Sequence, residues 1–211
     1  MRKAEVLVLA LVVVAFTVSA YLYPQLPDRV ASHWNAQGEV DGYMSRFWGV
    51  TFVPLLLTVL ALFFFAIPRI DPLKANIQAF RGYYDVLVVL ITLFMLGVHL
   101  QTLLWSLGTQ ISPNTTFPVA LGLLFIYIGV LLGKAKRNWF IGIRTPWTLS
   151  SDRVWDKTHR LGRKLFIAAG VIATIGVFFQ DYAVWFILVP VVSTALWSVA
   201  YSYFAYLQEA R

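Results

Sequence analysis

Six long apolar runs, separated by short polar connections, dominate the chain. They are too uniformly apolar for the amphipathic helices of a soluble bundle. A helix that spans a membrane needs about 20 apolar residues, so we predict an all-α, polytopic membrane protein with about six transmembrane helices. The predicted spans cover residues 6–23, 47–67, 83–107, 117–133, 165–179 and 182–207.

Three of these runs are unusual in their length or in their flanking residues. The fourth and fifth are shorter than the others and contain Gly, so we expect each to gain a turn from its flanks. The first begins with Arg2 and Lys3, and Val18-Ser19-Ala20 resembles the cleavage site of a signal peptide. Its apolar stretch exceeds the roughly 7–15 residues of a signal sequence, so we expect a retained membrane anchor.

Composition supports a lipid environment. Of the 211 residues, 59% are hydrophobic and 13% are charged, whereas a soluble domain carries roughly 25% charged residues. Six spans with short connections leave no room for a soluble domain of typical size. The chain contains no Cys, which excludes disulfides, thiolate metal sites and cysteine nucleophiles.

Lys and Arg are distributed so unevenly that they predict an orientation. With the N-terminus inside the cell, 15 of the 17 basic residues fall in cytoplasmic segments, including Arg211 in the tail, and only Arg29 and Arg46 fall outside. The positive-inside rule requires such an asymmetry, so we predict a multi-pass cell-membrane protein with both termini cytoplasmic. The net charge of +7 then lies beside helix ends and the lipid bilayer, which argues against direct nucleic acid binding.

The outer connection, residues 24–46, is too long for a plain linker. Turn-forming residues punctuate it, so we predict a short hairpin-like or coiled cap. One interpretation makes its nitrogen and oxygen donors a site for a metal cation or a small polar ligand. The other is that these side chains close the turns and hydrogen-bond the loop to itself. The donors are His33, Asn35, Glu39 and Asp41.

The inner connection, residues 134–164, combines basic residues with Trp, Gly and Pro. Gly142 and Pro146 break helices, so residues 138–149 are predicted to form a compact turn. Its aromatic residues favour the membrane interface, because an indole ring is apolar while its N–H stays in contact with water. These aromatic residues are Trp139, Phe140 and Trp147.

An amphipathic interfacial helix is predicted from Asp152 onward, leading directly into the fifth span. Trp155 and His159 stand four residues apart and would share a face. The helix either only anchors the bundle at the headgroups or forms a docking surface for a cytoplasmic partner or lipid headgroups. The apolar stripe consists of Val154, Trp155, Thr158 and Leu161, and the basic side carries Arg153, Lys157, Arg160 and Lys164.

Few polar residues lie at membrane depth. His99 and Gln101 fall in the outer half of the third span, and Asp85 lies near its cytoplasmic end. Such groups usually face the bundle interior, so we expect a neutral His99 bonded to a neighbouring helix. The other spans offer no deep carboxylate for a proton path. Gly129 and Gly133 form a GxxxG pair, which predicts close approach of another helix.

Both long loops resemble those of the SdpI family of membrane proteins. Residues 138–162 resemble its inner-loop signature, which has Asn, then Gly-x-Arg-Thr-Pro-Trp-Thr, then Trp-x-x-Thr-His. Residues 26–46 resemble the outer loop of an uncharacterised domain often found ahead of it. The predicted division is an N-terminal helical hairpin, residues 1–67, and an SdpI-like four-helix region, residues 68–211.

The resemblance implies an immunity protein and receptor. Such a protein protects against a secreted antimicrobial toxin and holds a cytoplasmic repressor at the membrane when toxin is present. On the outer face the implied contacts are His33, Asn35 and Asp41. On the cytoplasmic face the implied partner-binding residues are Asn138, Gly142, Arg144, Thr145, Pro146, Trp147, Trp155, Thr158 and His159.

Two other functions stay open at this point. The first is a membrane enzyme or metal-dependent site that uses the cluster of His33 and Asp41, and the second is a small transporter built around His99. The residues form no complete catalytic set and imply no cofactor, so we expect a protein that is not an enzyme.

Overall fold

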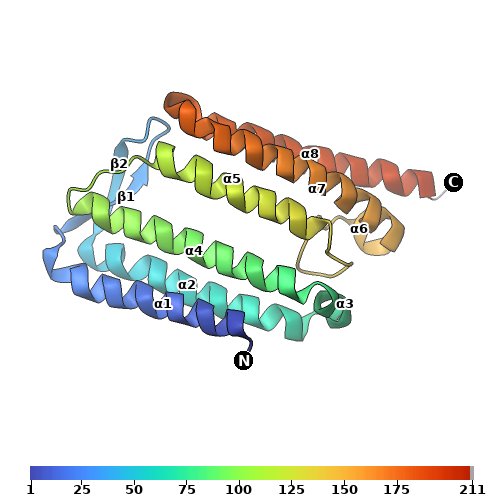
Figure 1. The fold of residues 1–211 in the computed structure, drawn as a ribbon, viewed down its shortest axis with the longest axis horizontal. Helices are drawn as coiled ribbons and strands as arrows, with labels where there is room; N and C mark the ends of the chain where they lie inside the picture. The colour runs from blue at the N-terminus through green and yellow to red at the C-terminus, as the bar shows by residue number, and fades with distance from the viewer. Residues whose placement is uncertain (210–211) are drawn as a thin grey trace.

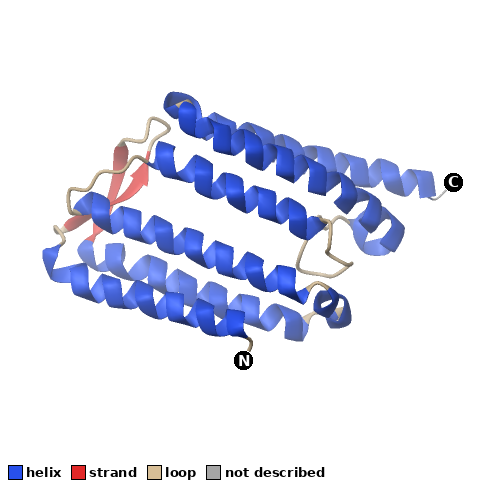
Figure 2. Cartoon of the chain, viewed as in Figure 1, coloured by secondary structure: helices blue, strands red, loops and turns tan. Residues whose placement is uncertain are grey.

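Helices make up most of the computed structural model, which describes residues 1–209 (Figure 1 and Figure 2). Six of the helices in this range are long and apolar enough to cross a membrane, so the predicted all-α polytopic fold is confirmed. They are α1 (Lys3–Leu22), α2 (Arg46–Ile70), α4 (Arg81–Ser106), α5 (Pro113–Leu132), α7 (Asp152–Ile175) and α8 (Ala183–Glu209).

Shorter elements connect the long helices. Two strands form an antiparallel hairpin, and the other connecting elements are single helical turns or slightly longer. The elements are η1 (Tyr23–Gln25), β1 (Arg29–Trp34), β2 (Val40–Ser45), α3 (Lys74–Ala79), α6 (Pro146–Ser150), η2 (Gly176–Phe178) and η3 (Gln180–Tyr182).

The long helices form two groups of three. Helices α1, α2 and α4 pack against one another, α5, α7 and α8 do the same, and α4 contacts α5 between the groups (Figure 1). The N-terminus and the end of α8 both lie at the end of the molecule that carries α3 and α6, and the hairpin lies at the other end (Figure 1). We call these the inner and outer ends.

The fourth and fifth spans gain length as predicted. Helix α5 already begins at Pro113, before the apolar run itself. The amphipathic segment and the fifth span form one continuous helix, α7, which Ser151 caps by accepting a hydrogen bond from the Val154 amide. The apolar stripe of this segment faces the protein interior, because Trp155 and Thr158 are fully buried.

Glycines let α5 and α7 approach closely. A Cβ on Gly129 would lie 2.8 Å from the Arg163 carbonyl oxygen, and one on Gly170 would lie 2.5 Å from the Gly122 carbonyl oxygen. The close approach predicted from Gly129 is therefore confirmed. Gly133, the other half of the predicted pair, faces the Arg163 side chain instead of a helix backbone.

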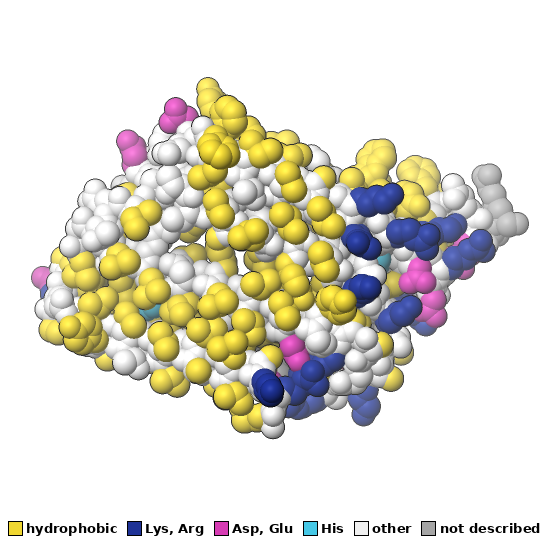
Figure 3. All heavy atoms as spheres, in the orientation of Figure 1, with side chains coloured by type: hydrophobic (Ala, Val, Ile, Leu, Met, Phe, Trp, Pro, Cys, Tyr) yellow, Lys and Arg dark blue, Asp and Glu magenta, His cyan; other side chains and the backbone are white. Residues whose placement is uncertain are grey.

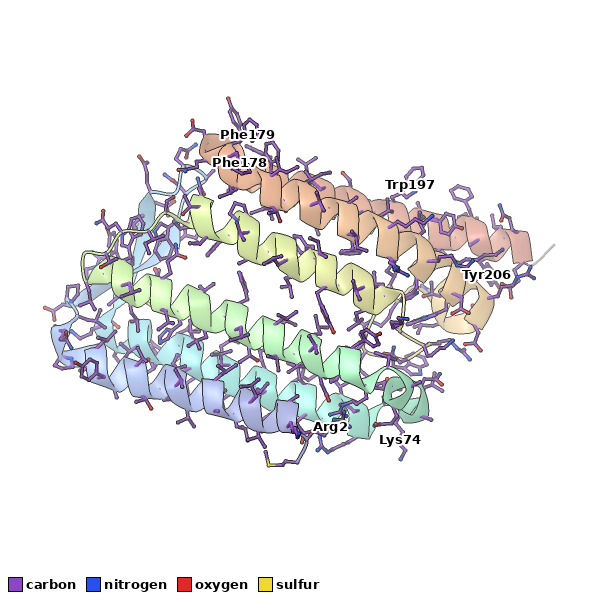
Figure 4. The ribbon with its side chains drawn as sticks, in the orientation of Figure 1. Arg2, Lys74, Phe178, Phe179, Trp197 and Tyr206 are labelled. Atoms are coloured by element: carbon purple, nitrogen blue, oxygen red, sulfur yellow. The ribbon has the colours of Figure 1, made fainter. Side chains whose placement is uncertain are left out.

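The surface of the long helices is apolar, as a lipid-facing surface must be. Trp197 on α8 is 63% exposed and Phe178 at the α7–α8 turn is 81% exposed. Figure 4 shows Trp197 pointing away from the bundle. On the face drawn in Figure 3, Lys and Arg gather at the inner end. Arg211, which contributed to the predicted orientation, lies outside the described residues.

The outer loop folds as the predicted hairpin. Arg29 pairs with Ser45 at its base, and the register shifts on either side of His33. The hairpin is seated on the first helix group by a small cluster that contains Val30, Val50 and Leu103. Trp34 also packs edge-on against Trp105 of α4, with ring centroids 5.6 Å apart.

Candidate functional site

Asn138 shapes the first turn of the inner loop. Its Nδ2 donates to the carbonyl oxygens of Lys136 and Ile141 at 2.9 and 2.8 Å. Its Oδ1 accepts from the amides of Phe140 and Ile141 at 2.9 and 2.6 Å. The side chain is fully buried, and every hydrogen-bonding position of the amide is used. Asn138 therefore fixes the loop and is not free to contact a partner.

Trp155 and His159 form a buried stack on α7, with ring centroids 3.9 Å apart and an interplanar angle of 17°. His159 Nε2 accepts from the Ile143 amide at 3.1 Å, so Nδ1 carries the ring proton and donates to the Trp155 carbonyl at 2.9 Å. Trp155 Nε1 donates to the Ala135 carbonyl oxygen at 2.9 Å. The stack thus fastens both sides of the loop to α7, and the shared face predicted for the two residues is confirmed.

Gly142 allows the loop to close over this stack. Its φ is +120°, a conformation that favours glycine. A Cβ at this position would clash with His159 Nε2 and would lie 3.2 Å from the indole ring of Trp155. The glycine of the signature is therefore required by both the backbone and the packing.

The Thr-Pro-Trp-Thr segment ties the loop to α8. The Thr145 amide donates to Thr148 Oγ1 at 2.9 Å and the Thr148 amide donates to Thr145 Oγ1 at 3.2 Å, which closes a capping box around α6. Thr145 Oγ1 also lies 3.0 Å from Ser202 Oγ, and Trp147 packs on Tyr203. Thr148 was not singled out from the sequence, although it stands at the third position after the cap, where a box partner is expected.

The inner loop also reaches the first helix group. Asp71, at the end of α2, accepts a hydrogen bond from the Trp139 amide at 2.9 Å, and Asn76 Nδ2 of α3 donates to the Arg137 carbonyl oxygen at 2.7 Å. Phe140 packs edge-on against Phe63. The loop therefore connects the two helix groups. Phe140 and Trp147, which the sequence predicted at the membrane interface, pack against the aromatic rings of Phe63 and Tyr203.

The structure divides the partner-binding candidates into two sets. The buried candidates Asn138, Thr145, Trp155 and His159 hold the loop through the hydrogen bonds described above. Thr158 is also buried, but its Oγ1 has no hydrogen-bond partner among the described residues. The exposed ones are Gly142, Arg144 and Pro146, with Trp147 half-buried. Trp139, which is 50% exposed, joins this exposed set because Arg144 donates to its carbonyl oxygen at 2.7 Å. We call Trp139, Gly142, Arg144 and Pro146 the exposed loop surface.

An ion-pair network around the buried Glu5, Arg81 and Asp85 closes the inner end of the first helix group. Glu5 Oε1 of α1 accepts from Arg69 at 3.1 Å and from Arg81 at 3.3 Å. Asp85 accepts from Arg81 at 2.7 Å and from Arg2 at 2.6 Å. Removing one partner of such a network leaves an uncompensated buried charge. The sequence placed Asp85 near the inner end, but it did not identify its partners.

In the outer hairpin the four candidate ligand residues form two side-chain pairs. His33 Nδ1 lies 2.5 Å from Asp41 Oδ1, and Asn35 Nδ2 donates to Glu39 Oε2 at 3.1 Å. Asn35 Oδ1 also accepts from the amides of Gln37 and Glu39, both at 3.0 Å. Among residues 1–209, no group of three or more His, Asp or Glu side chains is arranged to hold a metal ion. These contacts are those of a loop that hydrogen-bonds to itself.

His99 is bonded to a neighbouring helix, as predicted. Its Nε2 lies 2.7 Å from Ser19 Oγ of α1, and Ser19 Oγ donates to the Val50 carbonyl oxygen at 2.8 Å. Gln101 accepts from Thr116 at 2.8 Å and so links α4 to α5. These polar side chains connect helices within the bundle.

Together these features define a polytopic membrane protein whose two helix groups are joined by an ordered basic loop. Residues 134–202 match the SdpI/YfhL protein family and residues 10–58 match a domain of unknown function (DUF1648). The chain is 26% identical over 205 residues to the immunity protein SdpI of Bacillus subtilis (strain 168), which covers 97% of this chain and 96% of that protein. No solved structure matches the chain. The resemblance to the SdpI family that the loops predicted is confirmed by these matches.

Proposed function

We propose that this protein protects its cell from a secreted antimicrobial toxin. The observation that carries the proposal is the similarity to an immunity protein over 97% of the chain, which takes in both ordered loops and all the predicted spans. Residues 134–202 match the SdpI/YfhL family, and the relative matched over nearly the whole chain is named as an immunity protein.

The orientation in this proposal follows from charge. Lys and Arg gather at the inner end (Figure 3), and the positive-inside rule assigns such an end to the cytoplasm. Both termini and the exposed loop surface then face the cytoplasm, and the hairpin faces outward, where a secreted toxin arrives. Its exposed pairs, His33 with Asp41 and Asn35 with Glu39, are the candidate contacts for the toxin.

The proposal extends to signalling through the inner loop. A cytoplasmic repressor would contact the exposed loop surface, because Trp and Arg are the side chains most enriched at the centres of protein interfaces. The outer hairpin and the inner loop each connect the same two helix groups: Asn114 of α5 donates to the Ala36 carbonyl outside, and Asp71 accepts from Trp139 inside. A toxin that favours one spacing of the groups would thereby bias the loop.

Survival under toxin challenge tests the protective function. A host that expresses the full chain and a host with an empty vector are exposed to the secreted peptide fraction of the organism that encodes the chain. The proposal predicts greater survival of the expressing host, and equal killing of both hosts would overturn it.

Two variants in the same host test the role of the loop. Arg144→Ala changes an exposed side chain and should lower protection or signalling at unchanged membrane abundance. Trp155→Ala removes a buried anchor and should lower abundance as well. Unchanged protection with both variants would contradict a role for the inner loop.

A further inference from the structure

A basic pocket opens beside the inner loop, at the end of α5 and along the first turns of α7. Its volume is about 500 Å³, and its walls carry Lys134, Lys136, Arg160 and Arg163, together with a single carboxylate, Asp156. On the face drawn in Figure 3, Lys and Arg side chains gather at this end of the molecule. Four cations thus surround one hollow with one acidic group among them.

The four cations are not neutralised by the protein. Arg2, Arg69, Arg81 and Arg137 of the same end all lie within 4.0 Å of a carboxylate. Within residues 1–209, neither the four pocket cations nor Asp156 form an ion pair. These side chains are exposed and hydrated, and the excess of positive charge around one hollow creates a potential that attracts anions.

The position of the pocket in the fold indicates where that anion comes from. Leu132, the last residue of α5, and Gly133 form part of the wall. The absence of a side chain at Gly133 lets Arg163 lie across the end of the helix, since a Cβ there would be 2.6 Å from Arg163 Cδ. The pocket therefore begins where an apolar span ends, which is the level of lipid phosphates.

We propose that this pocket binds the phosphate of an anionic membrane lipid, with Lys134, Lys136, Arg160 and Arg163 as its ligands. The two guanidinium groups offer paired N–H donors to phosphate oxygens, and the two ammonium groups supply point charges. The lipid would lie against the wall that His159 shares with the pocket, next to the stack that holds the inner loop. This inference does not depend on the protein being an immunity protein.

Native mass spectrometry of the full chain in detergent, titrated with phosphatidylglycerol and separately with phosphatidylcholine, tests the proposal. The double variant Arg160→Gln/Arg163→Gln should bind phosphatidylglycerol roughly 30-fold more weakly, at about 1 kcal/mol per basic residue. The matched control, Arg153→Gln/Lys164→Gln, removes the same charge from exposed positions of α7 outside the pocket. It should bind as the wild type does.

Three outcomes would overturn the proposal. Equal weakening in the two double variants would mean general surface charge, and equal binding of phosphatidylcholine would mean that no anion is recognised. Displacement of phosphatidylglycerol by an equal concentration of inorganic phosphate would assign the pocket to a soluble phosphate. Thermal unfolding of each variant checks that the comparison is made between folded proteins.

Discussion

The outer hairpin and the inner loop do the same structural task by different means. Each connects the α1–α2–α4 group to the α5–α7–α8 group, the hairpin through Asn114 and the loop through Asp71 and Asn76. The hairpin closes on itself with exposed side-chain pairs, whereas the loop closes with buried ones. Exposed ion pairs are worth little, and buried polar groups are costly to leave unpaired.

This difference decides whether the residues that stabilise a loop are also the residues that a partner can contact. In the inner loop the side chains that hold the fold are buried, so Trp139 and Arg144 are left exposed at small cost. In the outer hairpin the same exposed side chains close the turns and form the available surface. We therefore expect substitutions in the inner loop to affect stability far more than those in the hairpin.

The largest effect is expected for Trp155→Ala. The ring is fully buried between His159 and the Ala135 carbonyl, so its loss should lower the free energy of unfolding by about 3–5 kcal/mol. Denaturant unfolding of the full chain in detergent measures this. Trp139→Ala, on an exposed Trp of the same loop, is the control and should change stability by less than about 0.5 kcal/mol. Equal losses would contradict the division between holding and contacting residues.

Gly142→Ala should follow, with a loss of about 3 kcal/mol from backbone strain and a clash with the His159 ring. Gly108→Ala makes a matched control, because Gly108 has a φ of +99° and open space around it. It should suffer the strain alone, about 1 kcal/mol. If both glycines tolerate Ala equally in thermal unfolding, the packing of the loop on His159 is wrong.

Asn114→Ala breaks the outer connection between the helix groups. The variant leaves the carbonyl oxygens of Ala36 and Gln180 without their donor, and a loss of about 1–3 kcal/mol is expected. Asn76→Ala does the same at the inner end, but the half-buried position gives water access. The inner substitution should therefore cost less. The reverse order in the same unfolding assay would mean that the hairpin is only loosely attached.

His33→Ala should have the smallest effect. Its side chain is 71% exposed in the pair with Asp41, and such pairs contribute about 0.2–1 kcal/mol. Stability should therefore be nearly unchanged, while toxin protection falls if the hairpin is the contact surface. A large loss of stability, or a bound metal in the purified wild type that is absent from the variant, would point to a metal-dependent site instead.

The sequence predicted much of this molecule because the relevant signals are local. Apolar run length predicted the spans, turn residues predicted the hairpin, and the four-residue spacing placed Trp155 and His159 on one face. The contact of Asp71 with the Trp139 amide and the pairing of Glu5 with Arg81 depend on contacts between segments far apart in the chain. For that reason the sequence indicated that the inner loop is ordered but not which of its residues face outward.

The most direct test of the central claim, that buried signature residues hold the inner loop, is hydrogen exchange at the Ile143 amide. This amide donates to His159 Nε2. In the wild-type chain this amide should exchange slowly, and in His159→Ala its protection should disappear. The control is the Ala31 amide, which donates to Ser106 Oγ at the outer end and should stay protected in the variant. Rapid exchange at Ile143 in the wild type, or unchanged protection in His159→Ala, would contradict the claim.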